Sequence, residues 1–223
     1  MGDVVDMQHV RLSDRPLLVC DVDDVVLEFL FPFEAYLNSL GHQLLPKSFR
    51  LTGNIISLET QSALEEQHVQ TILRDFFAQQ EEWQRPFGNS VDVLTQLGTM
   101  ADVVFLTAMP PAFTAQRRRL LDRLGLDFPL LATESPKGPV VKALHAERGL
   151  PLAFMDDMAH NLHSVADHAP ECLLVHIAPQ SDIHRFAPPT APQVIRANDW
   201  SSAGDRIVAH FNQKNPHPQN DHE

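Results

Sequence analysis

Short apolar runs alternate along the chain with longer stretches in which apolar residues recur every three or four positions. Runs of the first kind are typical of strands buried on both faces of a sheet, and stretches of the second kind are typical of amphipathic helices. Strands are predicted at residues 16–20, 102–106, 130–132, 152–155 and 172–177, and helices at 90–97, 111–124, 139–148 and 200–211. This order predicts an α/β fold, a Rossmann-like parallel sheet flanked by helices.

Local signals place the ends of two of these helices. Ser90 is a predicted N-cap, and Gly125 is a predicted C-cap. In the helix at 111–124, three leucines form an inward face, and the basic run at residues 117–119 is predicted to be exposed.

The interval between the first two predicted strands is long. About 80 residues separate Cys20 from Asp102, whereas a crossover connection needs about a dozen. Apolar stripes in this interval predict helices. We expect a core domain at 1–27 and 87–211, an inserted small helical cap at 28–86 and a disordered tail at 212–223; the alternative is that the inserted helices join the main core.

Composition narrows the class of protein. The 223 residues are 43% hydrophobic, which excludes wholesale disorder. The formal net charge of −12 argues against a nucleic-acid polymer as partner. No apolar run reaches the roughly 18 residues of a membrane span, and the first residues resemble neither a signal nor a transit peptide, so we expect a cytoplasmic protein without membrane contact. Cys20 and Cys172 lie in apolar runs and are predicted to be buried, reduced thiols.

Acidic pairs follow two predicted strands. Asp21 and Asp23 come directly after the first, and residues two apart in extended backbone point the same way. Asp156 and Asp157 follow the strand at 152–155. A solvated acidic turn would explain one such pair, but carboxylates converging from two strand ends repel unless a cation lies between them. Hard oxygen ligands favour Mg²⁺ over the transition metal that the nearby His160 and His163 would suggest, so these histidines are expected on the following helix.

A hydroxyl and a lysine complete the polar set. Thr107 directly follows the strand at 102–106, and the backbone amide of Ala108 comes next, where both could hold a phosphate oxygen. Lys137 precedes a predicted helix start, which favours an anion, although Lys142 is a competing lysine. Each of these residues alone is a weak signal.

The four elements in this order, from residue 16 to residue 172, resemble the haloacid dehalogenase-like superfamily, in a bacterial branch with a helical cap after the first strand. The resemblance implies that Asp21 is a nucleophile and that Asp23 is the general acid and base, with its backbone carbonyl touching Mg²⁺. It implies that Thr107 and Lys137 hold the phosphoryl group.

The last motif completes the implied site. Asp157 would be the usual metal ligand, with Asp156 assisting, and Asn161 would orient the lysine or the metal ligands. The chain departs from the superfamily at Asp24, where glycine is frequent, and this change adds negative charge to the loop.

The expected function is a Mg²⁺-dependent phosphatase that hydrolyses a small phosphomonoester, a nucleotide among the candidates, through an aspartyl-phosphate on Asp21. A phosphotransferase, a catalytically silent binding protein and a receiver-like signalling module are the alternatives. A dehalogenase is disfavoured because it does not need a second acid at Asp23. The basic residues of the expected cap are read as solvated, although one could contact a second anionic group: Lys47, Arg50, Arg74 and Arg85.

Overall fold

The computed structural model describes residues 5–213, so the predicted tail lies almost entirely outside the described residues. Its main sheet has six parallel strands in the order β5-β4-β1-β6-β7-β8. The strands are β1 (Leu17–Cys20), β4 (Asp102–Thr107), β5 (Leu130–Ala132), β6 (Leu152–Asp156), β7 (Leu173–His176) and β8 (Ile195–Arg196). The five predicted strands are confirmed, and β8 was missed because two residues give no pattern.

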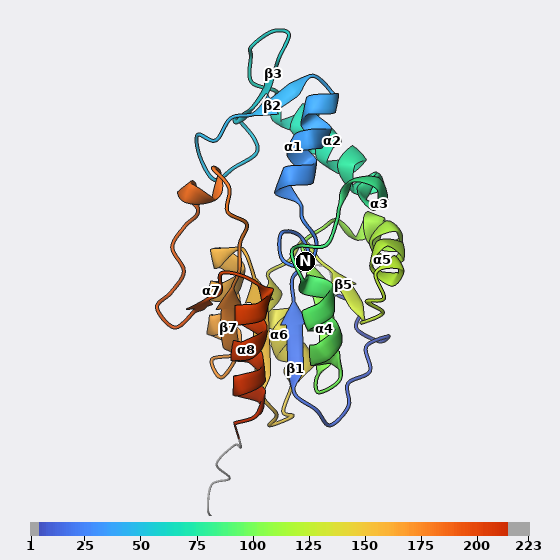
Figure 1. Cartoon of the computed structure of the whole chain (residues 1–223), viewed down its shortest axis with the longest axis vertical. Helices are drawn as coiled ribbons and strands as arrows, with labels where there is room; N and C mark the ends of the chain where they lie inside the picture. The colour runs from blue at the N-terminus through green and yellow to red at the C-terminus, as the bar shows by residue number, and fades with distance from the viewer. Residues whose placement is uncertain (1–4, 214–223) are drawn as a thin grey trace, which may run out of the picture.

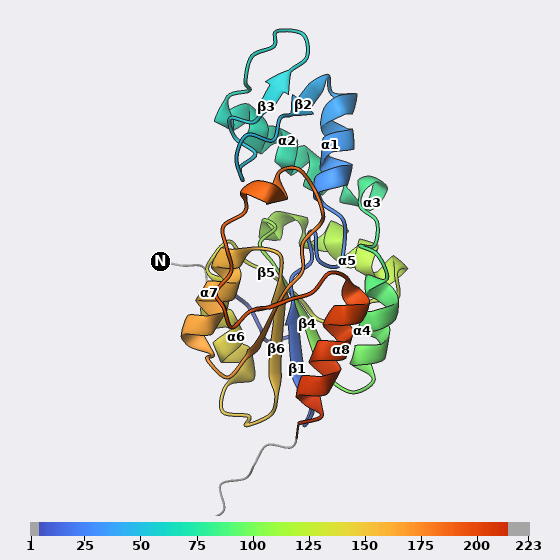
Figure 2. The ribbon, with the colours of Figure 1, turned by 60° about the vertical axis from the view of Figure 1, so that its left-hand side comes forward.

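Helices cover both faces of this sheet because the strands are apolar on both sides (Figures 1 and 2). Leu17 and Val19 of β1 pack with α6 (Lys137–His145) and α7 (Ala159–His168). Leu18 and Cys20 face the other layer. That layer is made by α4 (Ser90–Gly98), α5 (Thr114–Arg123) and α8 (Trp200–Phe211). The predicted Rossmann-like fold is therefore confirmed.

The chain between β1 and α4 lies beyond the carboxyl end of β1 and carries its own apolar core (Figure 1). It contains α1 (Leu30–Ser39), α2 (Glu66–Ala78) and α3 (Gln80–Trp83), together with an antiparallel hairpin of β2 (His42–Leu44) and β3 (Ile55–Ser57). We call residues 28–86 the inserted segment. The prediction of a mostly helical segment missed this hairpin, whose strands of three residues are too short to show an alternating pattern.

The loop that follows β7 rises from the sheet to the inserted segment (Figure 2). It carries a short 3₁₀ helix, η2 (His184–Phe186). Ile183 packs into the apolar core of the inserted segment, and the rings of Phe49 and His184 meet edge to face at 5.4 Å. This loop therefore joins the sheet domain to the inserted segment.

Three local predictions have clear outcomes. Gly125 has φ +75° and follows α5, as expected of a C-cap. The capping role of Ser90 is wrong, because Asn89 occupies the N-cap and the buried Ser90 hydroxyl donates to the carbonyl oxygen of Val26 at 2.8 Å. The exposure predicted for residues 117–119 is wrong at Arg117, whose exposed fraction is 0%.

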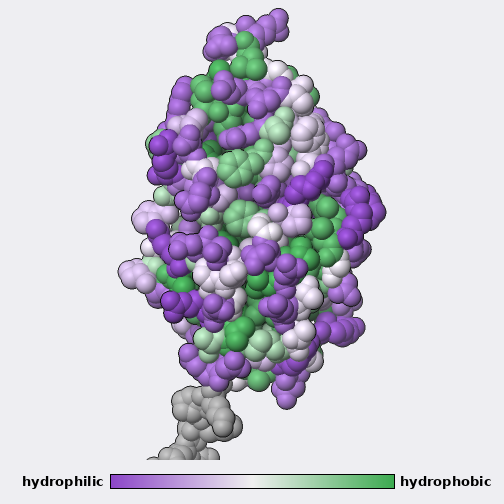
Figure 3. Space-filling model, viewed as in Figure 1, coloured by the Kyte–Doolittle hydropathy of each residue, from purple (hydrophilic) through white to green (hydrophobic). Residues whose placement is uncertain are grey.

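Cys20 and Cys172 are buried and free, as predicted. Hydrophilic residues cover most of the face seen in Figure 3, with small hydrophobic groups between them. Within residues 5–213, no helix has the length and apolar character needed to cross a membrane.

Candidate active site

The carboxyl ends of three neighbouring strands bring the predicted residues together. Asp21 follows β1, Thr107 ends β4 and Asp156 ends β6. A cavity of about 210 Å³ opens at this edge beneath the inserted segment. Five polar residues of the predicted site line this cavity together with Asp24, which follows Asp23 in the chain. The five are Asp21, Asp23, Lys137, Asp157 and Asn161.

Lys137 lies at the centre of this site. Its side chain is 1% exposed, and its Nζ donates to Asp21 Oδ1 and, at 2.7 Å, to Asp156 Oδ2. Burial alone would lower the pKa of Lys137, but the attraction of the two carboxylates outweighs it and raises the pKa. Because Lys142 is exposed, Lys137 is the lysine of the site.

Lys137 reaches this position because α6 approaches α7 closely at the next residue. A Cβ atom on Gly138 would lie 2.1 Å from the carbonyl oxygen of Ser164, so only glycine fits. The Gly138 amide also donates to Ser164 Oγ at 3.1 Å. The glycine therefore sets the depth at which the lysine enters the site.

Asp156 is fully buried behind the cavity wall. Both of its oxygens accept hydrogen bonds from Asn161 Nδ2, at 3.0 and 3.1 Å, and Oδ1 also accepts from the Met158 amide at 2.8 Å. These donors, with Lys137, fix the carboxylate. Through these hydrogen bonds, Asp156 in turn orients the side chains of Lys137 and Asn161.

Asp21, Asp156 and Asp157 offer oxygen atoms that lie within 4.8 Å of one another. Burial raises the pKa of both Asp21 and Asp157; the charge of Lys137 opposes this shift, and the neighbouring carboxylates add to it. Asp21 and Asp157 also line the cavity, so they present close, desolvated oxygen ligands to it. This donor set suits a hard cation such as Mg²⁺. The predicted positions of His160 and His163 on the next helix are correct, and both are exposed on α7.

The Asp23 carboxylate accepts four hydrogen bonds. Oδ1 accepts from Arg117 Nη2 and Gln84 Nε2, both at 2.8 Å, and Oδ2 accepts from Arg117 Nη1 at 3.2 Å and Thr107 Oγ1 at 3.3 Å. A carboxylate has about four lone-pair sites, so Asp23 has to release a donor before it can take a proton. The fully buried Thr107 also accepts from the Met109 amide at 3.1 Å, whereas Ala108 lines the cavity.

Arg117 is the principal residue that the sequence analysis missed. Its Nε donates to Gln80 Oε1 and its Nη2 to Gln84 Oε1 at 3.1 Å, so two glutamines of the inserted segment contact it. The run of three arginines at residues 117–119 suggested a solvated surface. The helical spacing instead indicated that Arg117 is buried, since it lies three and four residues before the inward-facing Leu120 and Leu121.

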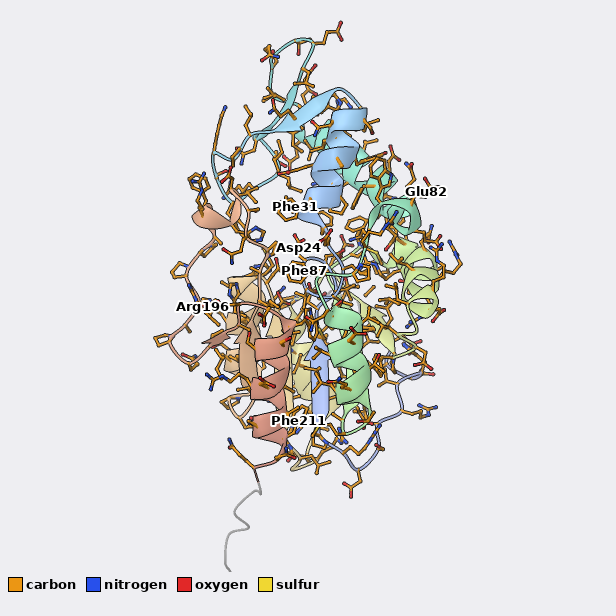
Figure 4. The ribbon with its side chains drawn as sticks, viewed as in Figure 1. Asp24, Phe31, Glu82, Phe87, Arg196 and Phe211 are labelled. Carbon is orange, nitrogen blue, oxygen red and sulfur yellow. The ribbon has the colours of Figure 1, made fainter. Side chains whose placement is uncertain are left out.

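Asp24 shapes the loop between β1 and α1. Its φ is +56°, and its carboxylate accepts from the amides of Phe29 and Leu30 at 2.8 to 3.2 Å, beneath the N-terminal end of α1 (Figure 4). Burial raises the pKa of Asp24 to about 6, although these amides oppose the shift. The aspartate at position 24, where glycine is frequent in the superfamily, thus fixes the start of the inserted segment through these hydrogen bonds.

His184 is a second missed residue, and the irregular sequence around it gave no signal. It lies within 4.8 Å of the Asp24 and Asp157 carboxylates, with 4.0 Å between its Nε2 and Asp157 Oδ2. Burial lowers the pKa of His184, which favours the neutral ring. The four basic residues of the inserted segment are exposed as expected, and one of them, Arg50, lines a second cavity next to His184.

No family model matches the chain, and no curated protein matches its sequence. Solved structures do match its fold. A haloacid dehalogenase-like hydrolase from Xanthomonas campestris has a TM-score of 0.56 at 14% identity, covering 88% of this chain and 96% of that one. A predicted phosphoglycolate phosphatase from Haemophilus somnus has a TM-score of 0.55 at 14% identity, covering 88% and 99%. An L-2-haloacid dehalogenase has a TM-score of 0.55 at 14% identity, covering 87% and 99%. The chain therefore has the fold of the haloacid dehalogenase-like superfamily.

Proposed function

We propose that the chain is a phosphatase that hydrolyses a small phosphomonoester through a phosphorylated Asp21. The observation that carries the proposal is the buried Lys137, which bridges Asp21 and Asp156 beside Asp157 at one sheet edge. A buried cation beside a carboxylate that lines a cavity can orient that carboxylate and attract a phosphoryl group. The similarity to a predicted phosphatase supports this choice.

Mg²⁺ is the proposed cofactor, and the donor set fits it. Asp21, Asp157 and the backbone carbonyl of Asp23 would hold the ion, which would neutralise charge on the phosphoryl oxygens. We assign Asp156 to positioning Lys137, since its oxygens already accept hydrogen bonds from Lys137, Asn161 and Met158.

The proposed reaction has two steps. In the first, an Asp21 oxygen forms a bond to phosphorus as the ester P–O bond breaks, and the departing alkoxide takes a proton from Asp23. In the second, water attacks the same phosphorus, gives a proton to Asp23 and releases inorganic phosphate, which restores Asp21. Because Asp23 accepts from Arg117, Gln84 and Thr107, it has to release at least one of them in each cycle.

The inserted segment would act as a cap, with boundaries near residues 28 and 86. Phe29 and Phe77 of this segment line the active-site cavity, so the segment covers the reacting groups. Such a cover excludes water that would compete with the substrate for the charged groups.

The test is release of phosphate from an aryl phosphate with Mg²⁺, with EDTA and Asp21→Asn as the negative conditions. Turnover that requires Mg²⁺ and is lost in Asp21→Asn supports the proposal. Asp14→Asn is the matched control, because Asp14 is exposed and does not line the cavity. Failure of the wild type on aryl phosphate and on a panel of phosphorylated metabolites would overturn it.

A binding protein of the same fold is the second candidate, and the fully occupied Asp23 carboxylate is the observation that favours it. Retained Mg²⁺ binding without turnover on any phosphate ester would select it. Release of halide from a 2-haloacid would instead select a dehalogenase, and phosphoryl transfer to an added alcohol but not to water would select a phosphotransferase.

A further inference from the structure

A second cavity, of about 270 Å³, adjoins the active-site cavity. The two share four lining residues: Asp24, Phe29, Asp157 and Met158. A molecule whose phosphoryl group lies at Asp21 therefore has the second cavity next to it, where the rest of its structure could lie.

The wall of the second cavity is mainly apolar, with Phe29, Leu30, Phe49, Leu51, Met158 and Ile183 among its residues. Phe29 is held by three further rings, since its centroid lies 5.5 Å from those of Phe33 and Phe76 and 5.8 Å from that of Phe77. Phe29 is thus an aromatic lining residue whose position is fixed by neighbouring rings. Phe49, from another part of the inserted segment, also lines the cavity and contacts His184.

Four of the ten lining residues are charged or polar. Two of them, Asp24 and His184, already make hydrogen bonds to the protein, and Asp157 belongs to the proposed Mg²⁺ site. Both Asp24 oxygens accept from backbone amides, and His184 Nδ1 shares a hydrogen bond of 2.8 Å with Ser181 Oγ. Arg50 is exposed at the rim. A molecule with several hydroxyl groups would find few partners for them here, and unpaired hydroxyls weaken binding.

We propose that the second cavity binds the alcohol portion of the substrate and that this portion carries an aromatic ring. The inference rests on the proposed phosphatase function. The volume suits the assignment, because an apolar protein cavity of about 150 Å³ already holds benzene and this one is larger. Flat rings also pack well against aromatic side chains such as Phe29.

The test compares benzyl phosphate with glycerol 3-phosphate at saturating Mg²⁺. Both release the alkoxide of a primary alcohol, so a difference in kcat/KM reports the ring rather than the leaving group. We expect benzyl phosphate to be favoured by about 10- to 100-fold, the range that apolar contacts supply. Acetyl phosphate, which has no ring, serves as the reporter of the phosphatase function itself.

Variants locate the preference. Phe49→Ala and Leu51→Ala should each reduce the ratio of the two kcat/KM values by about tenfold. Leu58→Ala is the matched control, because Leu58 belongs to the same segment, is 45% exposed and lies outside the cavity lining. Calorimetric binding of both esters to the Asp21→Asn protein makes the same comparison without turnover.

The outcomes separate the two proposals. Turnover of acetyl phosphate with equal kcat/KM for benzyl and glycerol phosphates would overturn the ring assignment and leave the phosphatase function standing. A tenfold preference for ribose 5-phosphate, which has several hydroxyl groups and no aromatic ring, over benzyl phosphate would also overturn it. Absence of turnover on every ester would overturn the phosphatase function, and equal binding of the two esters to Asp21→Asn would then overturn the ring assignment as well.

Discussion

The guanidinium of Arg117 donates to both carboxylate oxygens of Asp23, at 2.8 and 3.2 Å. The two partners differ in exposure, since the Arg117 side chain is 0% exposed and that of Asp23 is 20% exposed. Water can therefore reach the carboxylate when the pair is broken, whereas the cation stays buried. An arginine side chain also remains charged at all ordinary pH values.

This asymmetry predicts unequal costs for removing the two partners. Asp23→Leu leaves a buried, unpaired cation and should lower the free energy of unfolding by about 3–5 kcal/mol. Arg117→Met keeps much of the volume and leaves a partly hydrated carboxylate, so it should cost about 1–3 kcal/mol. Urea unfolding of both variants and of the double variant measures this.

The double variant serves as the control for this prediction. Because it removes both charges, its cost should be smaller than the sum of the two single costs. Equal and additive costs would show that the pair contributes nothing to folding.

Lys137 and Lys142 form a natural matched pair on one helix. Lys137→Met removes the cation that lies between Asp21 and Asp156, so phosphatase activity should fall by at least about 10²–10³-fold, the effect of losing one preorganised charged donor. Lys142→Met changes an exposed residue and should retain activity within about twofold. Steady-state assays decide, and equal activity of the two variants would remove Lys137 from the proposed mechanism.

The parts of the fold that could be predicted from the sequence are those with strong local patterns. Buried parallel strands are continuous apolar runs, and the acids at 21, 23, 156 and 157 stand at the ends of such runs. Parallel strands of one sheet present their carboxyl ends at the same edge, and these acids meet because β1 and β6 are neighbours in the sheet. The shared edge could be predicted from the apolar runs, whereas those runs do not show which strands are neighbours.

The missed features depend on contacts between distant segments. Arg117 is buried because glutamines at 80 and 84, in another part of the chain, satisfy its donors. His184 reaches the site on a loop with no periodic pattern, held by the contact of its ring with Phe49. No local property of either residue distinguishes it from a solvated side chain, except for the helical spacing of Arg117.

Gly138 provides a test of how the lysine is positioned. Gly138→Ala places a methyl group 2.1 Å from a backbone oxygen of α7, so the helices have to separate, and we expect a loss of stability of about 1–3 kcal/mol. Activity should fall as well, because Lys137 moves with α6. Thermal unfolding and phosphatase assays measure the two effects.

Gly98→Ala is the comparison for this variant. Its Cβ would lie 2.7 Å from the end of the half-buried Phe128 side chain rather than from backbone, and alanine favours a helix over glycine by about 1 kcal/mol. The two substitutions should therefore differ clearly in melting temperature. A Gly138→Ala protein as stable and active as Gly98→Ala would show that the close helix approach has no role.

Asp24 provides a pH-dependent prediction. Its pKa is raised from 3.8 to about 6 in the folded protein, so below about pH 4 the carboxyl is protonated in both the folded and the unfolded chain. As the pH rises further, the unfolded chain loses this proton first, and folding becomes less favourable until the folded carboxyl also ionises near pH 6. Each pKa unit corresponds to about 1.4 kcal/mol, so the loss between pH 4 and pH 7 is about 2–3 kcal/mol.

Asp24→Asn removes this loss, because the amide oxygen can still accept from the Phe29 and Leu30 amides and carries no charge. In EDTA, its stability relative to the wild type should therefore increase from pH 4 to pH 7. Asp127→Asn, at an exposed position, controls for the loss of one negative charge. The measurement is urea unfolding of the three proteins at pH 4, 5, 6 and 7. A constant difference between Asp24→Asn and the wild type would show that the folded protein does not hold Asp24 protonated at pH 5, and would contradict the burial argument.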